Sequence, residues 1–392
     1  MKQILQKSFV ALAVLIIMAV PLLTVVSPKQ GVSFYEQRYL AGIPIPTAAT
    51  VLNGEFFNAI ETFIQDHLVA RDSLLALNTA VELALDRVAV NNLIVTDDAL
   101  LDKFGYSRWD LGYLTDMAKN KAGNYAALAQ TVENYGGYFC FLGVPQFNIY
   151  FADKYPAFTD SRLWHATGMR TAFDQAMAEA GVPFINMYDA YQAVGMPEEY
   201  YFDSDHHYTT EGAFFACQTL LEYLQENAGL DANYLKAEDY ATRTLANPFL
   251  GSSNRKLYGL WDSDDRLTVM TPLEEIPYTR TDNGYPVAEI WQLPEDDTSW
   301  VTYNAYMGGD IAETVIRTNR PDLPSILIYG DSFTNPVEAM LWPNFNETRS
   351  LDFRYYTEKT LTEYIAEYRP DYVICIRDEV NFMADGLNGA TA

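Results

Sequence analysis

Two short stretches, far apart in the chain, carry residue types that together can activate a serine. They are Asp203-Ser204-Asp205-His206-His207-Tyr208 and Ile326-Leu327-Ile328-Tyr329-Gly330-Asp331-Ser332-Phe333. A serine hydroxyl is a weak nucleophile by itself and needs a neighbouring base, which in turn needs an orienting partner. A Ser-His-Asp set supplies all three roles. The chain therefore predicts a site at which these two stretches meet.

The second stretch has the order of a nucleophile turn. The apolar run Ile326–Tyr329 predicts a buried strand, Gly330 permits a tight turn, and Asp331-Ser332 precedes a segment that can begin a helix. Ser332 would then lie at the carboxyl end of a strand, beside N–H groups that can hold an oxyanion. We predict Ser332 as the nucleophile, although a serine in such a turn is more often only a helix cap.

The first stretch offers the base and its partner. Asp205 and His207 are two residues apart, so their side chains project to the same side of an extended chain. We expect Asp205 to hold one imidazole tautomer while the other ring nitrogen of His207 takes the Ser332 proton. His206 points the other way and is predicted to be structural. A metal site formed by Asp203, Asp205 and both histidines is the alternative, but no second cluster completes its ligand set, and we expect neither metal nor cofactor.

Other residues are candidates for binding the oxyanion or the substrate. The Ser332 N–H would be one oxyanion donor, and Asn335 and Ser252 are candidates for the second, with helix capping or turn bonding as the alternative role of each. Gly330 is a turn residue under every interpretation. Arg354 is a candidate for binding a carboxylated sugar, although pairing with Asp352 or Asp331 is the favoured interpretation.

Composition limits the function classes. The 392 residues are 49% hydrophobic, ample for a large core, and the net charge of −26 argues against nucleic acid or an anionic membrane surface as a partner. Acidic runs at 262–265 and 295–297 are interpreted as solvated loops, with Ca²⁺ binding as the alternative. Cys140, Cys217 and Cys375 lie in apolar patterns and are predicted to be buried free thiols.

The N-terminus predicts an extracytoplasmic protein. Lys2 and Lys7 precede an apolar run from Phe9 to Val26 that just reaches the length of a membrane-spanning helix. No small-residue cleavage site precedes Pro28, so we expect a single-pass signal anchor with the bulk of the chain outside the cell membrane. A cleaved signal peptide and a secreted protein are the alternative.

Strand and helix patterns alternate through most of the chain and predict an α/β fold with a parallel sheet covered on both faces. We expect strands at 138–144, 182–186, 325–329 and 372–377 and a hairpin at 93–103. We expect helices at 56–90, 115–134, 164–180, 209–227, 337–341 and 361–368. The first of these is one helix, or two with a break at 71–73, and the second is expected to be capped by Thr115. The expected division is an anchor at 1–30, a segment at 31–110 packed on the catalytic domain, a first catalytic part at 111–229, an inserted loop-and-strand segment at 230–310, and a second catalytic part at 311–392.

The Asp205-His206-His207-Tyr208 signature resembles that of the DHHW protein family, which is similar to the alginate O-acetyltransferases of bacterial exopolysaccharide machinery. The likeness extends to Glu36-Gln37-Arg38, Asn53-Gly54-Glu55-Phe56, Gly251–Leu257, Asp331-Ser332-Phe333-Thr334-Asn335 and Asp352-Phe353-Arg354-Tyr355-Tyr356. It implies a three-layer SGNH-hydrolase-like fold with permuted motif order, since the Asp-His pair precedes the serine. Tyr208 departs from the family, which usually has Trp there, and would alter the acceptor pocket.

The resemblance implies a serine-dependent acetyl transferase or esterase that acts on a cell-surface or secreted polysaccharide through the triad Ser332, His207 and Asp205. A transferase would need an integral-membrane acyl-donor protein as a further partner if its acetyl group came from the cytoplasm. The interpretation from a different class is a non-catalytic carbohydrate-binding or assembly component of a cell-envelope polysaccharide system.

Overall fold

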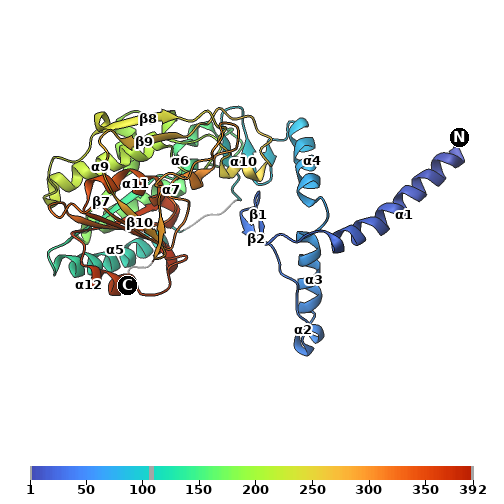
Figure 1. Cartoon of the computed structure of the whole chain (residues 1–392), viewed down its shortest axis with the longest axis horizontal. Coiled ribbons are helices and arrows are strands. Elements are labelled where there is room, and N and C mark those ends of the chain that lie inside the picture. The colour runs from blue at the N-terminus through green and yellow to red at the C-terminus, as the bar shows by residue number, and fades with distance from the viewer. Residues whose placement is uncertain (1, 106–109, 390–392) are drawn as a thin grey trace. The chain divides into compact units, whose positions relative to one another are not determined.

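The computed structural model describes residues 2–105 and 110–389 and divides the chain into two compact units (Figure 1). The smaller unit comprises Met1–Asn91 and Asn254–Asp262, and the larger comprises Asn92–Ser253 and Ser263–Ala392. Residues 106–109, next to the boundary predicted at residue 110, and residues 390–392 of the last predicted segment lie outside the described residues. Each unit is described by itself.

The smaller unit is mostly helical. Its elements are α1 (Lys2–Val26), β1 (Val32–Ser33), β2 (Arg38–Tyr39), α2 (Ala48–Leu52), α3 (Glu55–Asp66), α4 (Arg71–Ala84) and β3 (Ala89–Val90). The predicted helix at 56–90 is thus two helices, and the chain turns between them at Ala70, whose φ of +56° is left-handed. Residues 85–90 are not helical, contrary to the sequence prediction, since α4 ends at Ala84.

The apolar N-terminal run forms α1, and its stretch Ile4–Val26 is long and apolar enough to cross a membrane. It is one such helix among the residues that the structure describes, and a signal sequence near an N-terminus has the same length and composition. Length and composition thus make α1 a candidate membrane-spanning helix.

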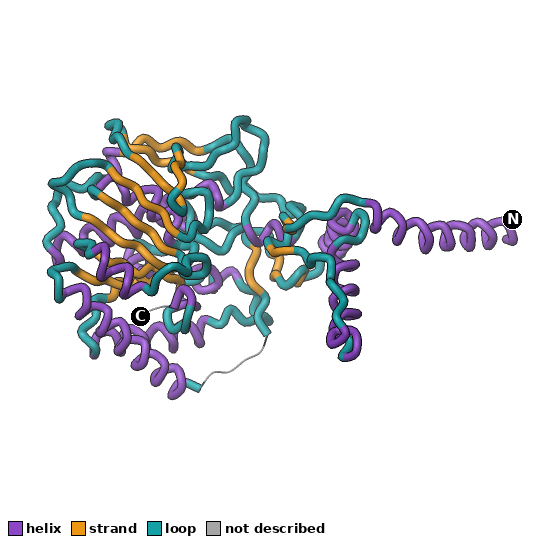
Figure 2. The backbone as a smooth tube through the Cα atoms, turned by 60° about the horizontal axis from the view of Figure 1, so that its bottom comes forward, coloured by secondary structure: helices purple, strands orange, loops and turns teal. Residues whose placement is uncertain are grey.

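An eight-stranded sheet forms the centre of the larger unit (Figure 2). In spatial order its strands are β11 (Tyr285–Val287), β10 (Thr279–Asp282), β12 (Glu313–Arg317), β14 (Glu347–Leu351), β13 (Ser325–Gly330), β15 (Tyr372–Asp378), β6 (Tyr138–Val144) and β7 (Phe184–Asn186). The five strands from β14 to β7 are parallel, as predicted. The other three are antiparallel, so the predicted insertion extends the sheet through β10 and β11.

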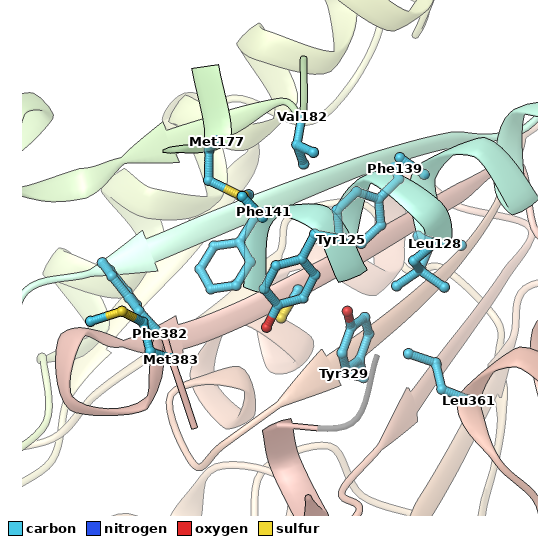
Figure 3. Packing of buried hydrophobic residues seen from close by; sticks show 14 of the residues in the cluster. Tyr125, Leu128, Phe139, Phe141, Met177, Val182, Tyr329, Leu361, Phe382 and Met383 are labelled. Carbon is cyan, nitrogen blue, oxygen red and sulfur yellow. The ribbon is translucent and has the colours of Figure 1, made fainter. Parts of the chain in front are cut away.

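Helices cover both faces of this sheet. One face packs against α5 (Leu111–Glu133), α7 (Leu163–Glu179) and α12 (Leu361–Tyr368). Figure 3 shows the strand residues Phe141 and Tyr329 among side chains from these helices. On the other face, the Tyr372 hydroxyl donates to the Ala228 carbonyl of α9 (Thr210–Ala228) at 3.3 Å. The α9 helix in turn packs on α11 (Thr334–Leu341). Alternate residues of the strands thus serve two separate cores.

The remaining elements are short: β4 (Leu93–Val95), β5 (Leu100–Asp102), α6 (Phe147–Tyr150), α8 (Met187–Ala193), β8 (Tyr240–Thr244), α10 (Ser252–Lys256) and β9 (Thr268–Pro272). The hairpin predicted at 93–103 is confirmed as β4 and β5. The Thr115 cap is wrong: Asp110 caps α5 by accepting from the Gly112 N–H at 2.7 Å, while Thr115 bonds inside the helix. The cysteines are buried free thiols, as predicted.

Candidate active site

The turn that carries Ser332 joins β13 to α11 and is held from three directions. The Asp331 carboxylate accepts the N–H of Phe333, the N–H of Asp378 and the Asn381 amide, each at 3.1 Å. Gly330 is required by a close approach, because a Cβ there would lie 1.8 Å from the carbonyl oxygen of Ile376 in the neighbouring strand. The turn therefore presents Ser332 at the carboxyl end of a central parallel strand, where α/β sheets place their sites.

The Asp-His-His loop is fixed by a carboxylate from outside it. Asp265 accepts the N–H groups of Asp203 and Ser204 at 3.1 and 2.9 Å and the Ser204 hydroxyl at 2.5 Å. Gly251 packs so closely beneath this loop that a Cβ would lie 2.2 Å from the Ser204 carbonyl oxygen. Thr209 follows the loop and caps α9, the helix predicted at 209–227, by accepting the Gly212 N–H. Asp265 is therefore a loop-fixing group rather than part of a solvated loop.

The two stretches meet in one chain of hydrogen bonds. His207 Nε2 lies 2.7 Å from Ser332 Oγ, and His207 Nδ1 lies 2.7 Å from Asp205 Oδ1. Asp205 and His207 are 1% and 4% exposed, whereas Ser332 is only partly buried and can be reached from solvent. The structure thus brings Ser332, His207 and Asp205 together with the connectivity that activates a serine hydroxyl.

Asp205 is ionised in this setting. Burial alone would raise the pKa of its carboxyl, but the opposite charge and hydrogen bond of His207 outweigh burial, and the pKa lies below its ordinary value. The carboxylate also accepts the N–H of His207 at 3.2 Å and the N–H of Ser252 at 2.6 Å. These bonds fix the imidazole orientation, since a neutral His207 must carry its proton on Nδ1 and leave Nε2 to accept one.

Two tyrosines lock the relative positions of the loop and the turn. The buried Tyr208 hydroxyl donates to the Phe333 carbonyl. The Tyr303 ring stacks on the His207 imidazole, with centroids 3.7 Å apart and planes inclined by 10°. Its hydroxyl donates to the Ser332 carbonyl at 3.2 Å. Burial raises the pKa of Tyr303 well above its ordinary value, so this hydroxyl remains a donor.

The structure changes the interpretation of Tyr208. Its ring is fully buried (0% exposed) and does not line an acceptor pocket, contrary to the expectation from the motif's resemblance. Its ring packs edge-on against the rings of Tyr201 and Phe333. A phenol can donate to the Phe333 carbonyl from this position, so Tyr208 supports the turn that carries Ser332.

The remaining predicted residues lie near the site but are already engaged. The Ser252 hydroxyl pairs with His206 Nδ1 at 2.7 Å. The Asn335 amide donates to Asp310 Oδ1 at 3.1 Å. No hydrogen bond among the described residues uses the Ser332 N–H.

Arg354 also has partners. Its guanidinium lies 2.6 Å from Asp352 Oδ2 and 2.8 Å from Asp310 Oδ2, as the favoured interpretation required for Asp352. Asp310 therefore links Arg354 to the Asn335 amide, and both groups are held in place by a carboxylate that the sequence analysis did not single out.

A metal ion would need the same atoms as the hydrogen-bond relay, the chain of bonds from Ser332 through His207 to Asp205. Ligand atoms of Asp205, His206 and His207 lie within 4.8 Å of one another, the one such trio among the described residues. Both His207 nitrogens, however, are already bonded, one to Asp205 and one to Ser332. A metal on His207 would therefore disrupt the relay.

Three site residues, Tyr303, Asp310 and Asp265, were not predicted as such. Tyr303 and its neighbours appeared in the sequence only as a turn-rich segment, and Asp265 only as one of several acids in a run. Their spacing from the two motifs carries no signal, because the contacts arise from the folded insertion. Coevolving positions in an alignment are the kind of observation that can reveal such contacts in advance.

The site and fold define a mixed α/β protein with a large, mostly parallel sheet and a buried Asp-His pair facing a serine. No protein-family model and no curated protein sequence matches the chain. Solved structures do. Bacillus cereus PatB1 with a sulfonyl adduct is 20% identical, with a TM-score of 0.62 over 75% of this chain and 96% of PatB1. PatB1 in a second structure is 22% identical, with a TM-score of 0.63 over 75% of this chain and 97% of PatB1.

A DHHW family protein from Eubacterium siraeum is 18% identical, with a TM-score of 0.54 over 76% of this chain and 94% of that protein. The O-acetyltransferase domain of Pseudomonas putida AlgJ aligns more loosely, at 12% identity and a TM-score of 0.46 over 75% of this chain and 93% of that domain. At these identities the likeness shows the fold. The resemblance to DHHW proteins predicted from the motifs is confirmed at that level.

Proposed function

We propose that this chain is a serine-dependent acyl transferase or esterase of SGNH-hydrolase-like architecture, acting on acetyl groups of a cell-surface or secreted polysaccharide. The observation that carries the proposal is the relay Ser332–His207–Asp205, with both of its links at 2.7 Å. The PatB1 structure with a sulfonyl adduct supports it, because sulfonylating reagents react with activated nucleophiles such as a triad serine.

The reaction would proceed in two balanced steps. Ser332 Oγ attacks the ester carbonyl while His207 Nε2 takes its proton, and His207 then returns that proton to the departing alcohol. The acetyl-serine is resolved when a sugar hydroxyl or water attacks its carbonyl and loses a proton to His207; the bond to Ser332 Oγ then breaks, and His207 returns the proton to Oγ. Asp205 stabilises the imidazolium in both steps without itself being protonated.

The oxyanion would be held first by the Ser332 N–H, which none of the described hydrogen bonds uses. For the second donor, Asn335 is the better of the two candidates. Its amide carries two N–H bonds and the structure commits one of them to Asp310. Ser252 instead donates its N–H to Asp205 and pairs its hydroxyl with His206. Gly330 contributes only the geometry of the turn.

We further propose that α1 tethers the enzyme to the cell membrane, with the catalytic unit outside. A polysaccharide is then within reach, and an integral-membrane protein would supply acetyl groups that originate in the cytoplasm. The support is the apolar stretch Ile4–Val26, which satisfies the length of a bilayer span. Secretion after cleavage is the alternative, and N-terminal sequencing of the mature protein separates the two.

The test is covalent labelling of the full-length chain in detergent by phenylmethanesulfonyl fluoride and, separately, by 4-nitrophenyl acetate, followed by intact mass. We expect one sulfonyl group on the wild type, none on Ser332→Ala, and slow labelling of His207→Ala. Ser252→Ala is the matched control: it removes a hydroxyl from the same site but leaves the backbone N–H on Asp205, so labelling should persist.

If neither reagent modifies folded wild-type protein, the enzyme proposal is wrong and the carbohydrate-binding or assembly interpretation replaces it. If labelling occurs, acetylated oligosaccharides offered with and without a second saccharide distinguish a transferase, which forms a new ester, from an esterase, which releases acetate.

A further inference from the structure

A groove of about 580 Å³ lies in the larger unit, beside the segment that holds the catalytic histidine. Its walls come from the predicted insertion and the residues just after it, between Asp282 and Ile311. This volume suits several units of an extended ligand rather than a water cluster or a single ion. Nothing in the proposed acyl-transfer step uses the groove.

The lining combines one aromatic face with neutral hydrogen-bonding groups. Trp300 is 46% exposed at the groove, and Gln292, Thr302 and Asn304 present amides and a hydroxyl around it. A flat indole face packs against the C–H face of a sugar ring, while amides and hydroxyls bond the ring hydroxyls. This mixture fits a hydroxyl-rich ligand better than a purely apolar one.

The groove has no positive charge to offer an anionic ligand. Its lining contains no lysine or arginine, and its one acid, Asp282, accepts the Arg280 guanidinium at 2.7 and 2.9 Å. Arg354, which was only a candidate for binding a carboxylated sugar, is held by Asp352 and Asp310. With a net charge of −26 on the whole chain, an anionic polymer would be repelled rather than attracted.

The groove and the relay share one segment. Thr302 and Asn304 line the groove, while Tyr303 between them stacks on His207 and donates to the Ser332 carbonyl. Ile311 lines the groove, while its neighbour Asp310 bonds the Asn335 amide. A chain bound in the groove would therefore contact the same segment that positions the base, with Thr302 and Asn304 on the groove side and Tyr303 on the side of His207.

We propose that this groove is a subsite for an uncharged, hydroxyl-rich stretch of glycan, which selects a neutral polysaccharide over a uronate polymer as the substrate. The inference rests on the proposed acyl-transfer function for its meaning. Its test does not depend on turnover, because binding is measured on the Ser332→Ala protein without any acyl donor.

The experiment is isothermal titration calorimetry of full-length Ser332→Ala protein with neutral hexasaccharides of gluco, manno and galacto configuration and with a hexauronate. We expect at least one neutral hexasaccharide to bind at least tenfold more tightly than the hexauronate. Adding Trp300→Leu should weaken that binding at least tenfold, whereas Trp300→Phe should retain most of it. Trp164, which is 44% exposed but does not line the groove, provides the matched control Trp164→Leu.

The proposal is overturned if none of the three neutral saccharides binds, if the hexauronate binds as tightly, or if Trp300→Leu and Trp164→Leu weaken binding equally. Thermal denaturation confirms that each variant is folded, and Trp300→Phe keeps the test open if the leucine variant does not fold. Failure of the labelling test with Ser332 would leave these binding results unchanged, so the two proposals fail separately.

Discussion

Replacing Tyr303 tests whether one side chain holds both the base and the nucleophile. Its hydroxyl bonds the Ser332 carbonyl at 3.2 Å, and its ring lies 3.7 Å from the His207 ring, nearly parallel to it. A neutral hydrogen bond contributes about 0.5–1.5 kcal/mol, so Tyr303→Phe should slow acylation by about 2- to 13-fold. An aromatic face over a desolvated cation contributes about 2 kcal/mol, and His207 becomes such a cation in the transition state. Tyr303→Leu, which loses both contacts, should therefore slow acylation by about 100-fold.

The assay is the second-order rate of Ser332 sulfonylation by phenylmethanesulfonyl fluoride, followed by intact mass. Tyr306→Phe is the matched control, because Tyr306 is also buried but its hydroxyl bonds Thr210 rather than the relay. Its rate should stay within about threefold of wild type, since its hydroxyl does not touch the reacting groups. In a His207→Ala background the effect of Tyr303→Leu should largely vanish, as expected for coupled residues. A folded Tyr303→Leu protein that reacts at the wild-type rate, or a Tyr306→Phe protein that is equally slowed, would refute the reasoning.

Three further outcomes follow from the site and its surroundings. Asp205→Asn should slow sulfonylation by about 10²- to 10⁴-fold, because the amide cannot accept all three hydrogen bonds that the carboxylate accepts and carries no charge to stabilise the imidazolium. The control Asp203→Asn, in the same loop, should react within about threefold of wild type. Equal rates for the two variants would contradict the assigned roles. Burial raises the pKa of Glu338 to about 7 from 4.5, so between these pH values the folded protein keeps a proton that the unfolded chain has released. The free energy of unfolding should therefore fall by up to about 3 kcal/mol as the pH rises from 5 to 8. Urea titrations of Glu338→Gln should lack this part of the pH dependence, and an unchanged dependence would show that Glu338 does not titrate in this range. Gly330→Ala should lower the free energy of unfolding by at least about 3 kcal/mol because its Cβ meets the neighbouring strand, whereas Gly123→Ala, in open space on α5, should be neutral or stabilising.

Local sequence patterns determined the parts of the site that depend on near neighbours. Asp205 and His207 are two residues apart, and their hydrogen bond at 2.7 Å forms within one loop. The alternation expected of an extended chain is wrong, since the loop is bent and the His206 ring lies 3.7 Å from the His207 ring. The strand before Ser332, the turn at Gly330 and the Thr209 cap follow in the same way from residues adjacent in sequence. These features could be predicted because their causes lie within a few positions of one another.

The tertiary structure alone decided which distant residues complete the site. Tyr303 is about 100 residues from His207 in sequence, and the distance between them in space depends on how the insertion folds, which no local periodicity encodes. The same holds for the hydrogen bond between Asp310 and Asn335 and for that between Asp265 and Ser204. Tyr208 shows the limit most plainly: its aromatic character suggested a substrate contact, but packing turned it inward to bond the Phe333 carbonyl. Residue type and spacing named the reacting groups, whereas burial and long-range contacts decided what holds them in place.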